Sequence, residues 1–295
     1  MSDFRLKVFQ SVAKNLSFTK ASQELFVSQP AITKHIQELE ATYQTRLFDR
    51  QGSKISLTES GRLLLEHCER ILEDYKRLEY EMHLLHNEYI GELKLGASTT
   101  IAQYVLPPLL GSFIGKFPQV NLSLLNGNSR EIEAALQEHR IDLGLVEGVF
   151  RLPNLKYTTF LEDELVAVVH SKSRLQLPEE ITPQDLPAIP LVLRERGSGT
   201  LDVIERSLQK HGVKLSSLHV LMYLGSTESI KLFLENSDCM GIVSIRSICK
   251  ELAAGTFRVV EIKDMPMLRD FCSVQLQGQE GGLSQAFMNY MFMSR

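Results

Sequence analysis

Clusters of hydroxyl, amide and charged side chains in the second half of the chain are the residues best suited to bind a small molecule. They follow short apolar segments and open segments of helical pattern, where N–H and O–H donors favour an anion. The donors, together with Arg194 and Arg196, predict a small anion or carboxylate as the ligand. The alternative, that a given Ser or Thr only caps its helix, stays open. The candidate residues are Ser98, Thr99, Thr100, Gln103, Asn128, Glu147, Arg194, Ser198, Thr200 and Thr227.

A second group of polar residues lies near the N-terminus and has the chemistry to contact DNA. Gln29 can bind adenine through two hydrogen bonds, and Thr33 can reach a base edge or a thymine methyl group. Lys34 can contact guanine or phosphate. Ordinary solvated surface residues are the alternative. The candidates are Ser28, Gln29, Pro30, Thr33 and Lys34 on one helix, and Arg50, Ser53 and Lys54 on a basic hairpin.

Three short helices are predicted to position the DNA-contacting residues. The first carries apolar residues at helical spacing from Phe4 to Val12. The second runs from Phe18 to Leu25 behind a Ser17 cap, and the third from a Ser28 cap to about Tyr43. A turn and a short strand, residues 51–57, then predict a wing. This order is that of a winged helix-turn-helix, although a plain helical bundle shows similar spacing.

A long amphipathic helix is predicted from Thr58 until Gly91 stops it. Its apolar residues keep a seven-residue period, which predicts a coiled-coil seam and a homodimer. Packing of this helix on its own domain is the alternative. The two sets of positions, each residue of the second set lying four after one of the first, are Leu64, Ile71, Leu78 and Leu85, and Cys68, Tyr75, Met82 and Tyr89.

From Glu92 onward, short apolar strands alternate with helices, which predicts two α/β lobes with mainly parallel sheets. The fold class is therefore α/β with an all-α N-terminal part. We expect a DNA-binding domain at 1–58, a dimerisation helix at 59–90 and an effector domain at 91–295. Within the effector domain we expect lobe I at about 91–162 and 266–295, and lobe II at about 163–265.

Composition narrows the class of protein. The chain of 295 residues has a net charge of −4, but residues 1–60 hold eight Lys or Arg against six Asp or Glu, which leaves 24 against 30 for the rest. It has neither an apolar run of membrane length nor a signal-peptide pattern, so a cytoplasmic protein is expected. No GxSxG, P-loop, HExxH or GxGxxG pattern occurs, which argues against an enzyme. We expect no metal and no cofactor beyond the effector.

The N-terminal residues resemble the DNA-binding signature of the LysR-type transcriptional regulators. The matching runs are Phe18–Ser22, Leu25–Ile36, Leu39–Glu40, Leu47–Arg50 and Leu57–Gly61. The departure is Tyr43-Gln44, where the family has Leu-Gly at the turn after the recognition helix.

This resemblance implies two lobes like those of a periplasmic binding protein, with the effector held between them. It also implies tetramers that bind and bend operator DNA, and RNA polymerase as a further candidate partner. Residues 96–101 and 194–200 look most like the subgroup that regulates carbon fixation and sulfur assimilation.

Two other functions for the two-lobed domain remain alternatives. The lobes alone would fit a solute-binding protein, but the N-terminal 90 residues argue against it. Cys239 and Cys249 would permit redox sensing, but neither has a clearly basic neighbourhood, so we expect buried structural thiols.

Overall fold

The computed structural model divides the chain into two compact units, Met1–Glu88 and Tyr89–Arg295. The structure describes residues 4–51, 54–85, 89–148, 151–278 and 281–293. The side chains of Arg50 and Lys54, and of several residues in the C-terminal half of the long helix, lie outside this description. Each unit has its own hydrophobic core.

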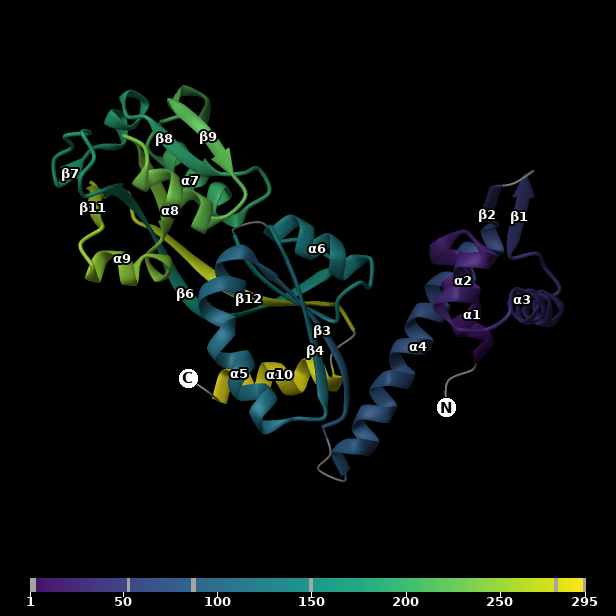
Figure 1. Cartoon of the computed structure of the whole chain (residues 1–295). Helices are drawn as coiled ribbons and strands as arrows, with labels where there is room; N and C mark the ends of the chain where they lie inside the picture. Colours follow the sequence, from purple (N-terminus) through teal and green to yellow (C-terminus); the bar gives the residue numbers. More distant parts are fainter. Residues whose placement is uncertain (1–3, 52–53, 86–88, 149–150, 279–280, 294–295) are drawn as a thin grey trace. The chain divides into compact units, whose positions relative to one another are not determined.

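Three short helices and a hairpin precede the long helix of the N-terminal unit (Figure 1). Ser17 caps the second helix by accepting a hydrogen bond from the Lys20 amide at 3.2 Å, and Ser28 caps the third by accepting one from Ala31 at 3.4 Å. Both caps agree with the sequence. The elements are α1 (Phe4–Asn15), α2 (Phe18–Glu24), α3 (Gln29–Tyr43), β1 (Phe48–Gln51) and β2 (Lys54–Leu57).

The strands β1 and β2 pair antiparallel and form the wing (Figure 1). The aromatic ring of Phe48, at the start of β1, lies 5.5 Å from that of Phe9 and 5.8 Å from that of Phe18. These contacts anchor the wing on α1 and α2, because aromatic rings at such separations pack favourably edge to face or tilted.

Some apolar residues of the long helix α4 (Glu59–Leu85) pack in the core of the N-terminal unit, and others are exposed to solvent. Cys68 is fully buried, and its thiol lies 3.2 Å from the carbonyl oxygen of Leu6. The prediction that Cys68 lines a seam with a partner is therefore wrong, because α1 already covers it. Ile71, Leu78 and Met82 are 40%, 52% and 52% exposed, so these seam positions stay open.

The C-terminal unit is built on one long mixed sheet whose main path runs β4-β3-β5-β12-β6-β10-β8-β9. Pairing is parallel within each end of the path and antiparallel around β6 and β12. The strands are β3 (Gly91–Ser98), β4 (Val120–Gly127), β5 (Leu143–Glu147), β6 (Leu155–His170), β7 (Glu180–Ile181), β8 (Leu191–Arg194), β9 (Val220–Leu224), β10 (Met240–Ser244), β11 (Phe257–Ile262) and β12 (Met267–Leu276).

Two lobes share this sheet (Figure 1). Lobe I holds β3, β4 and β5, and lobe II holds β8, β9 and β10. The strands β6 and β12 run between the lobes and pair with each other, from Leu155 opposite Leu276 to Leu165 opposite Met267. Lobe I has the helices η1 (Ile101–Val105), α5 (Leu106–Lys116), α6 (Ser129–Gln137) and α10 (Gly282–Met293), and lobe II has η2 (Pro183–Ala188), α7 (Gly199–Lys210), η3 (Leu215–Ser217), α8 (Thr227–Glu235), η4 (Ile245–Ser247) and α9 (Cys249–Ala253).

The apolar segments expected as strands all fall within observed strands: residues 93–96, 120–125, 143–146, 164–169, 191–193, 220–223, 241–244 and 259–262. The two-residue β7 was not expected, and neither was the long β12. Its apolar pattern is interrupted by Arg269 and Asp270. Arg269 is buried on this strand. A charged residue at a buried position breaks the apolar pattern from which a strand is predicted, so the sequence did not indicate β12.

Candidate functional site

The outer face of α3 presents the polar residues predicted to read DNA. Ser28, Gln29, Pro30 and Lys34 are exposed and Thr33 is half-buried. The Thr33 hydroxyl donates to the Gln29 carbonyl oxygen at 3.1 Å, and the Gln29 side-chain amide donates to that hydroxyl at 3.4 Å. Both of these hydrogen bonds lie within α3 and neither involves the core, so the face is available to a ligand outside the unit.

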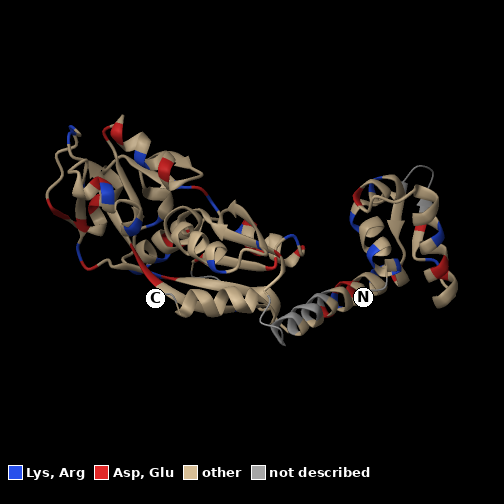
Figure 2. Ribbon diagram, turned by 60° about the horizontal axis from the view of Figure 1, so that its bottom comes forward, with Lys and Arg blue, Asp and Glu red and all other residues tan. Residues whose placement is uncertain are grey.

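The wing carries the remaining predicted DNA contacts. The backbone of Arg50 lies in β1 opposite Ile55, and Lys54 begins β2. Ser53 and the side chains of Arg50 and Lys54 lie outside the described residues, so their predicted contacts stay predictions. Figure 2 shows basic and acidic residues interspersed along the helices of this unit, in keeping with its small net charge.

Gln44 ends the recognition helix in a left-handed conformation, with φ of +51°. The Thr45 amide donates to the Glu40 carbonyl oxygen at 3.1 Å, and the Leu47 amide donates to the Glu40 carboxylate at 2.8 Å. The turn therefore keeps the left-handed backbone that favours glycine, although glutamine occupies it.

Three of the predicted effector residues are the last residues of parallel strands: Ser98 ends β3, Glu147 ends β5 and Arg194 ends β8. The C-terminal ends of parallel strands are where open α/β sheets bind ligands. All three side chains are buried, and they come from both lobes. The structure thus brings together residues almost a hundred positions apart.

The Glu147 carboxylate is the centre of this cluster. It accepts hydrogen bonds from the hydroxyls of Ser98 and, at 3.4 Å, Thr100. Its oxygen also lies 3.6 Å from the Arg269 guanidinium. Burial raises the pKa of Glu147 above its ordinary value, while Arg269 and Arg194 oppose the rise.

The Arg194 guanidinium joins the two lobes at the same place. Its Nη2 donates to the Thr99 hydroxyl of lobe I at 3.4 Å and to the Gly225 carbonyl oxygen at 3.3 Å. Its Nε donates to Glu195 at 2.8 Å. The residue is 1% exposed, yet its Nη1 has no hydrogen-bond partner within the described chain. The buried Oε1 of Gln103 is also without one.

Sequence reasoning missed two residues of this cluster, Arg269 and Asp163. Arg269 donates from Nε to Asp163 at 2.8 Å and from Nη1 to the Thr200 hydroxyl at 2.9 Å. Asp163 also accepts from the Ser244 hydroxyl at 2.7 Å. The available signal was a charged pair, Arg269-Asp270, within an otherwise apolar segment.

Other predicted residues lie at helix starts around the cluster. Ser198 caps α7 by accepting from the Leu201 amide at 3.1 Å, and Asn128 caps α6 by accepting from Glu131 at 3.0 Å. Thr227 is buried at the start of α8, beside its Ser226 cap. The capping alternative therefore accounts for the described side-chain bonds of Ser198 and Asn128.

Glycine allows the two lobes to approach closely at the start of α7. A Cβ atom built on Gly199 would lie 2.0 Å from the Glu147 carbonyl oxygen, so only glycine fits against the end of β5. The Ser129 hydroxyl donates to that carbonyl oxygen at 2.7 Å. The close approach of Gly199, rather than the Ser129 hydrogen bond within lobe I, places the end of β5, and with it Glu147, against lobe II.

The cysteines of lobe II differ from each other. Cys239 is fully buried, and burial raises the pKa of its thiol. Cys249 is exposed, so the expectation of two buried thiols is wrong for it. The reason is its position at the start of the short helix α9, none of whose residues is buried.

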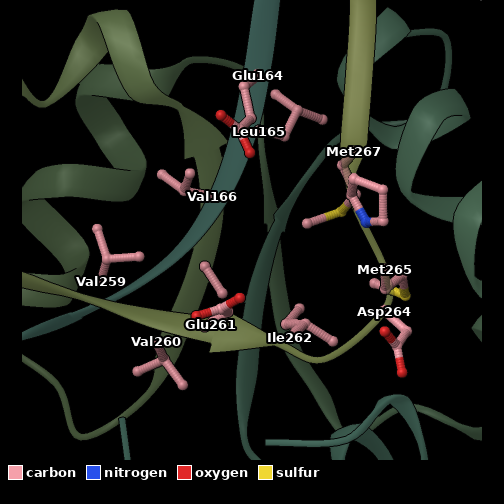
Figure 3. A pocket seen from close by; sticks show the side chains of 12 residues that line it. Glu164, Leu165, Val166, Val259, Val260, Glu261, Ile262, Asp264, Met265 and Met267 are labelled. Carbon is pink, nitrogen blue, oxygen red and sulfur yellow. The ribbon is translucent and has the colours of Figure 1, made fainter. Parts of the chain in front are cut away.

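A separate pocket of about 470 Å³ lies in lobe II (Figure 3). It forms where β11 leaves β6 to pair with β7, and where the pairing of β12 with β6 ends at Leu165. Leu165, Ile262 and Met267 are buried in it, and the carboxylates of Glu164 and Glu261 are exposed there. It includes none of the residues predicted from the sequence.

Comparison with known proteins identifies the family. Residues 86–292 match the LysR substrate binding domain, and residues 4–62 match the bacterial regulatory helix-turn-helix protein, lysR family. The chain belongs to the LysR family of transcriptional regulators. Members of this family are DNA-binding transcriptional regulators rather than enzymes. This LysR-type regulator has both the DNA-binding and the effector-binding domain of the family.

Two named relatives are similar in sequence to this chain over almost its whole length. The regulator is 30% identical over 264 residues to CysL of Bacillus subtilis, covering 90% of this chain and 87% of that protein. It is 30% identical over 289 residues to the RuBisCO operon transcriptional regulator of Acidithiobacillus ferrooxidans, covering 98% and 92%. The latter name agrees with the resemblance to regulators of carbon fixation.

A solved structure matches the effector domain. The regulatory domain of Synechocystis CcmR, in complex with 2-PG, superposes with a TM-score of 0.62 at 28% identity, covering 69% of this chain and 97% of that one. Among the helices that the structure describes, none is long and apolar enough to cross a membrane. The described residues also hold no group of three or more His, Cys, Asp or Glu placed to bind a metal ion.

Proposed function

We propose that the effector of this LysR-type regulator is a small oxyanion, a phosphate ester or a carboxylate, bound between the lobes. The observation that carries this proposal is Arg194, whose guanidinium is buried with one nitrogen unpartnered. A buried charged donor without a partner is costly, and an anionic oxygen would satisfy it. The complex of the related CcmR regulatory domain with 2-PG supports a small-molecule effector in this domain.

The surrounding groups fit such a ligand. The hydroxyls of Ser98, Thr99 and Thr100 gather at the end of β3, and Gln103 adds a polar side chain one helical turn further. The starts of α7 and α8, with Thr200 and Thr227 buried near them, point toward the same strand ends, and helix N-termini favour anions.

The effector would act by changing how the lobes meet. Arg194 of lobe II already donates to Thr99 of lobe I, so a ligand between them contacts both lobes at once.

We infer that this change in the lobes is passed to tetramers bound at an inverted repeat, since protein two-fold symmetry is mirrored in the operator. A change in DNA bending, which has a cost of order 1–6 kcal/mol, would alter promoter activity without release of DNA. Such a regulator, with RNA polymerase as a candidate partner, acts in the cytoplasm.

The effector proposal is tested by calorimetry on the full-length protein with 2-phosphoglycolate and with glycolate. We expect 2-phosphoglycolate to bind more tightly, because its additional charge gives stronger ionic hydrogen bonds. Arg194→Gln should weaken binding by at least about tenfold, as loss of a charged hydrogen bond does. Arg206→Gln is the control, because Arg206 is an exposed guanidinium of the same lobe that belongs to no predicted site. Equal affinities for the two variants would contradict the proposal.

The DNA-reading proposal is tested by selecting bound fragments from genomic DNA. Combined Gln29→Ala and Thr33→Ala should abolish enrichment of one inverted repeat, since each good base contact contributes about 1–3 kcal/mol of discrimination. Thr42→Ala is the control. Its hydroxyl donates to the carbonyl oxygen four residues before at 2.7 Å, as Thr33 does at 3.1 Å, but at the far end of α3. Enrichment that survived the double substitution would contradict the assignment of α3.

A further inference from the structure

Glu147 is a carboxylate placed among donors that would bind an anion. It takes hydrogen bonds from Ser98 and Thr100, and it is 3% exposed. An anionic ligand that reaches these hydroxyls comes directly against a second negative charge. In a buried site like charges repel strongly, and one of them must be protonated. The presence of Glu147 therefore restricts which anions the site accepts.

The positively and negatively charged groups that the structure describes around Glu147 are equal in number. Arg269 of β12 lies 3.6 Å from its carboxylate, and Arg194 of β8 is the other nearby cation. The helices α6 and α7 face it with hydroxyls, those of Ser129 and Thr200. Arg246 also belongs to this cluster, since its Nε lies 3.6 Å from the Asp163 carboxylate. Within the described residues of the cluster, three cations are balanced by three carboxylates: Arg194, Arg246 and Arg269 by Glu195, Asp163 and Glu147.

We propose that Glu147 makes the effector site selective for oxyanions that bring a proton of their own, such as hydrogen phosphate or a hydrogen phosphate ester, over aprotic oxyanions such as sulfate. This inference rests on the proposed anion site between the lobes. The hydroxyl of the ligand donates to the Glu147 carboxylate. The ionised oxygens of the ligand accept from the free Nη1 of Arg194. They also accept from the hydroxyls of Ser98 and Thr100, which the ligand hydroxyl replaces as donors to Glu147. An aprotic anion leaves Glu147 facing bare negative oxygens.

A proton on Glu147 can take the place of the proton on the ligand, because in either case one proton lies between the carboxylate and the bound anion. Burial raises the pKa of Glu147, so a sulfate ion can enter together with a proton when the pH is low. Sulfate affinity should then fall up to tenfold for each pH unit above the pKa of Glu147, because one proton is taken up. Inorganic phosphate carries its own proton throughout the neutral range and should show a smaller fall.

The test measures binding of inorganic phosphate and of sulfate to the full-length protein by calorimetry, at pH 6 and pH 8 and constant ionic strength. These two ions share tetrahedral shape and differ in their protons. At pH 8 we expect a preference for phosphate of at least about tenfold, since sites built around a ligand hydroxyl reject analogues without it. The preference should shrink at pH 6. This comparison uses the wild-type chain and does not depend on a variant that folds.

Glu147→Gln then tests the residue. The amide is uncharged and donates hydrogen bonds, so sulfate affinity should rise and the preference should fall to within about twofold. Glu138→Gln, at an exposed carboxylate of the same lobe, is the control and should keep the wild-type preference.

Two failures are distinguishable. If the wild-type protein binds phosphate and sulfate equally at pH 8, Glu147 does not select the ligand, although the anion site stands. If neither ion binds, and 2-phosphoglycolate does not bind either, the anion site between the lobes is contradicted and the selectivity falls with it. Binding of 2-phosphoglycolate alone, with an affinity that does not change from pH 6 to pH 8, contradicts the selectivity only.

Discussion

The polar residues of the recognition helix α3 and those of the cluster around Glu147 differ in their exposure and in their separation along the sequence. On α3 the DNA-reading candidates lie within seven consecutive positions and are largely exposed. Between the lobes, Ser98, Glu147, Arg194 and Arg269 are distant in sequence and nearly fully buried. An exposed polar residue can serve a ligand with little effect on the fold. A buried charge is part of the fold and of the site at once, because removal of its partner leaves it uncompensated.

The largest expected effect follows from breaking the buried network at Arg269. Arg269→Met leaves Asp163 and Glu147 buried without their common cation, which should cost about 3–5 kcal/mol in the free energy of unfolding. Hydrogen exchange of β6 and β12 amides in the full-length chain measures this loss. Arg140→Met, at a guanidinium 53% exposed, is the control and should stay within about 0.5 kcal/mol. A loss below about 1 kcal/mol for Arg269→Met would remove the contrast between the two regions.

A smaller loss is expected where the lobes touch through backbone. Gly199→Ala places a methyl group against the Glu147 carbonyl oxygen, and such overpacking costs typically 1–3 kcal/mol. The melting temperature of the C-terminal unit should fall by roughly 2–12 °C. Gly111→Ala is the control, since nothing lies within 4 Å of a Cβ atom at that position of α5. An unchanged melting temperature for Gly199→Ala would show that the lobes separate without cost.

The pH dependence of stability sharpens the comparison at Glu147. The pKa of Glu147 is raised in the folded chain, so its proton stabilises the fold below its ordinary pKa of 4.5. That stabilisation is lost as the pH rises through the folded-state pKa, with a slope of at most about 1.4 kcal/mol per pH unit. Urea unfolding followed by circular dichroism from pH 4 to pH 8 should show this fall for the wild-type protein. In Glu147→Gln the fall should be absent, and an identical fall in both would assign it to another group.

The smallest effect is expected in the N-terminal unit, where backbone conformation rather than charge is at issue. Gln44→Gly relieves a side chain from a φ of +51° and should raise stability by about 0.5–1 kcal/mol. Gln37→Gly, at an exposed position inside α3, should lower it by about 1 kcal/mol. Thermal unfolding of the two variants should therefore shift in opposite directions. Shifts of the same sign would contradict the conformational explanation.

Local sequence patterns were sufficient for the N-terminal unit. Ser17 and Ser28 cap the helices that their positions predict, and the apolar spacing of α3 buries Ile32, Ile36 and Leu39. Helix caps and helical periodicity are set by residues within one or two turns. The same reasoning failed at Cys68, because the period of α4 does not reveal which partner covers each face.

The sequence by itself determined the family, the two-part organisation and the set of hydroxyl and guanidinium residues at strand ends. Only the tertiary structure decided that Glu147 takes hydrogen bonds from Ser98 and Thr100, and that Arg269 and Asp163 complete the cluster. The physical reason is the range of the interactions. Caps and periodicity act between neighbours along the chain, whereas a buried charge is satisfied by whichever groups the fold brings to it.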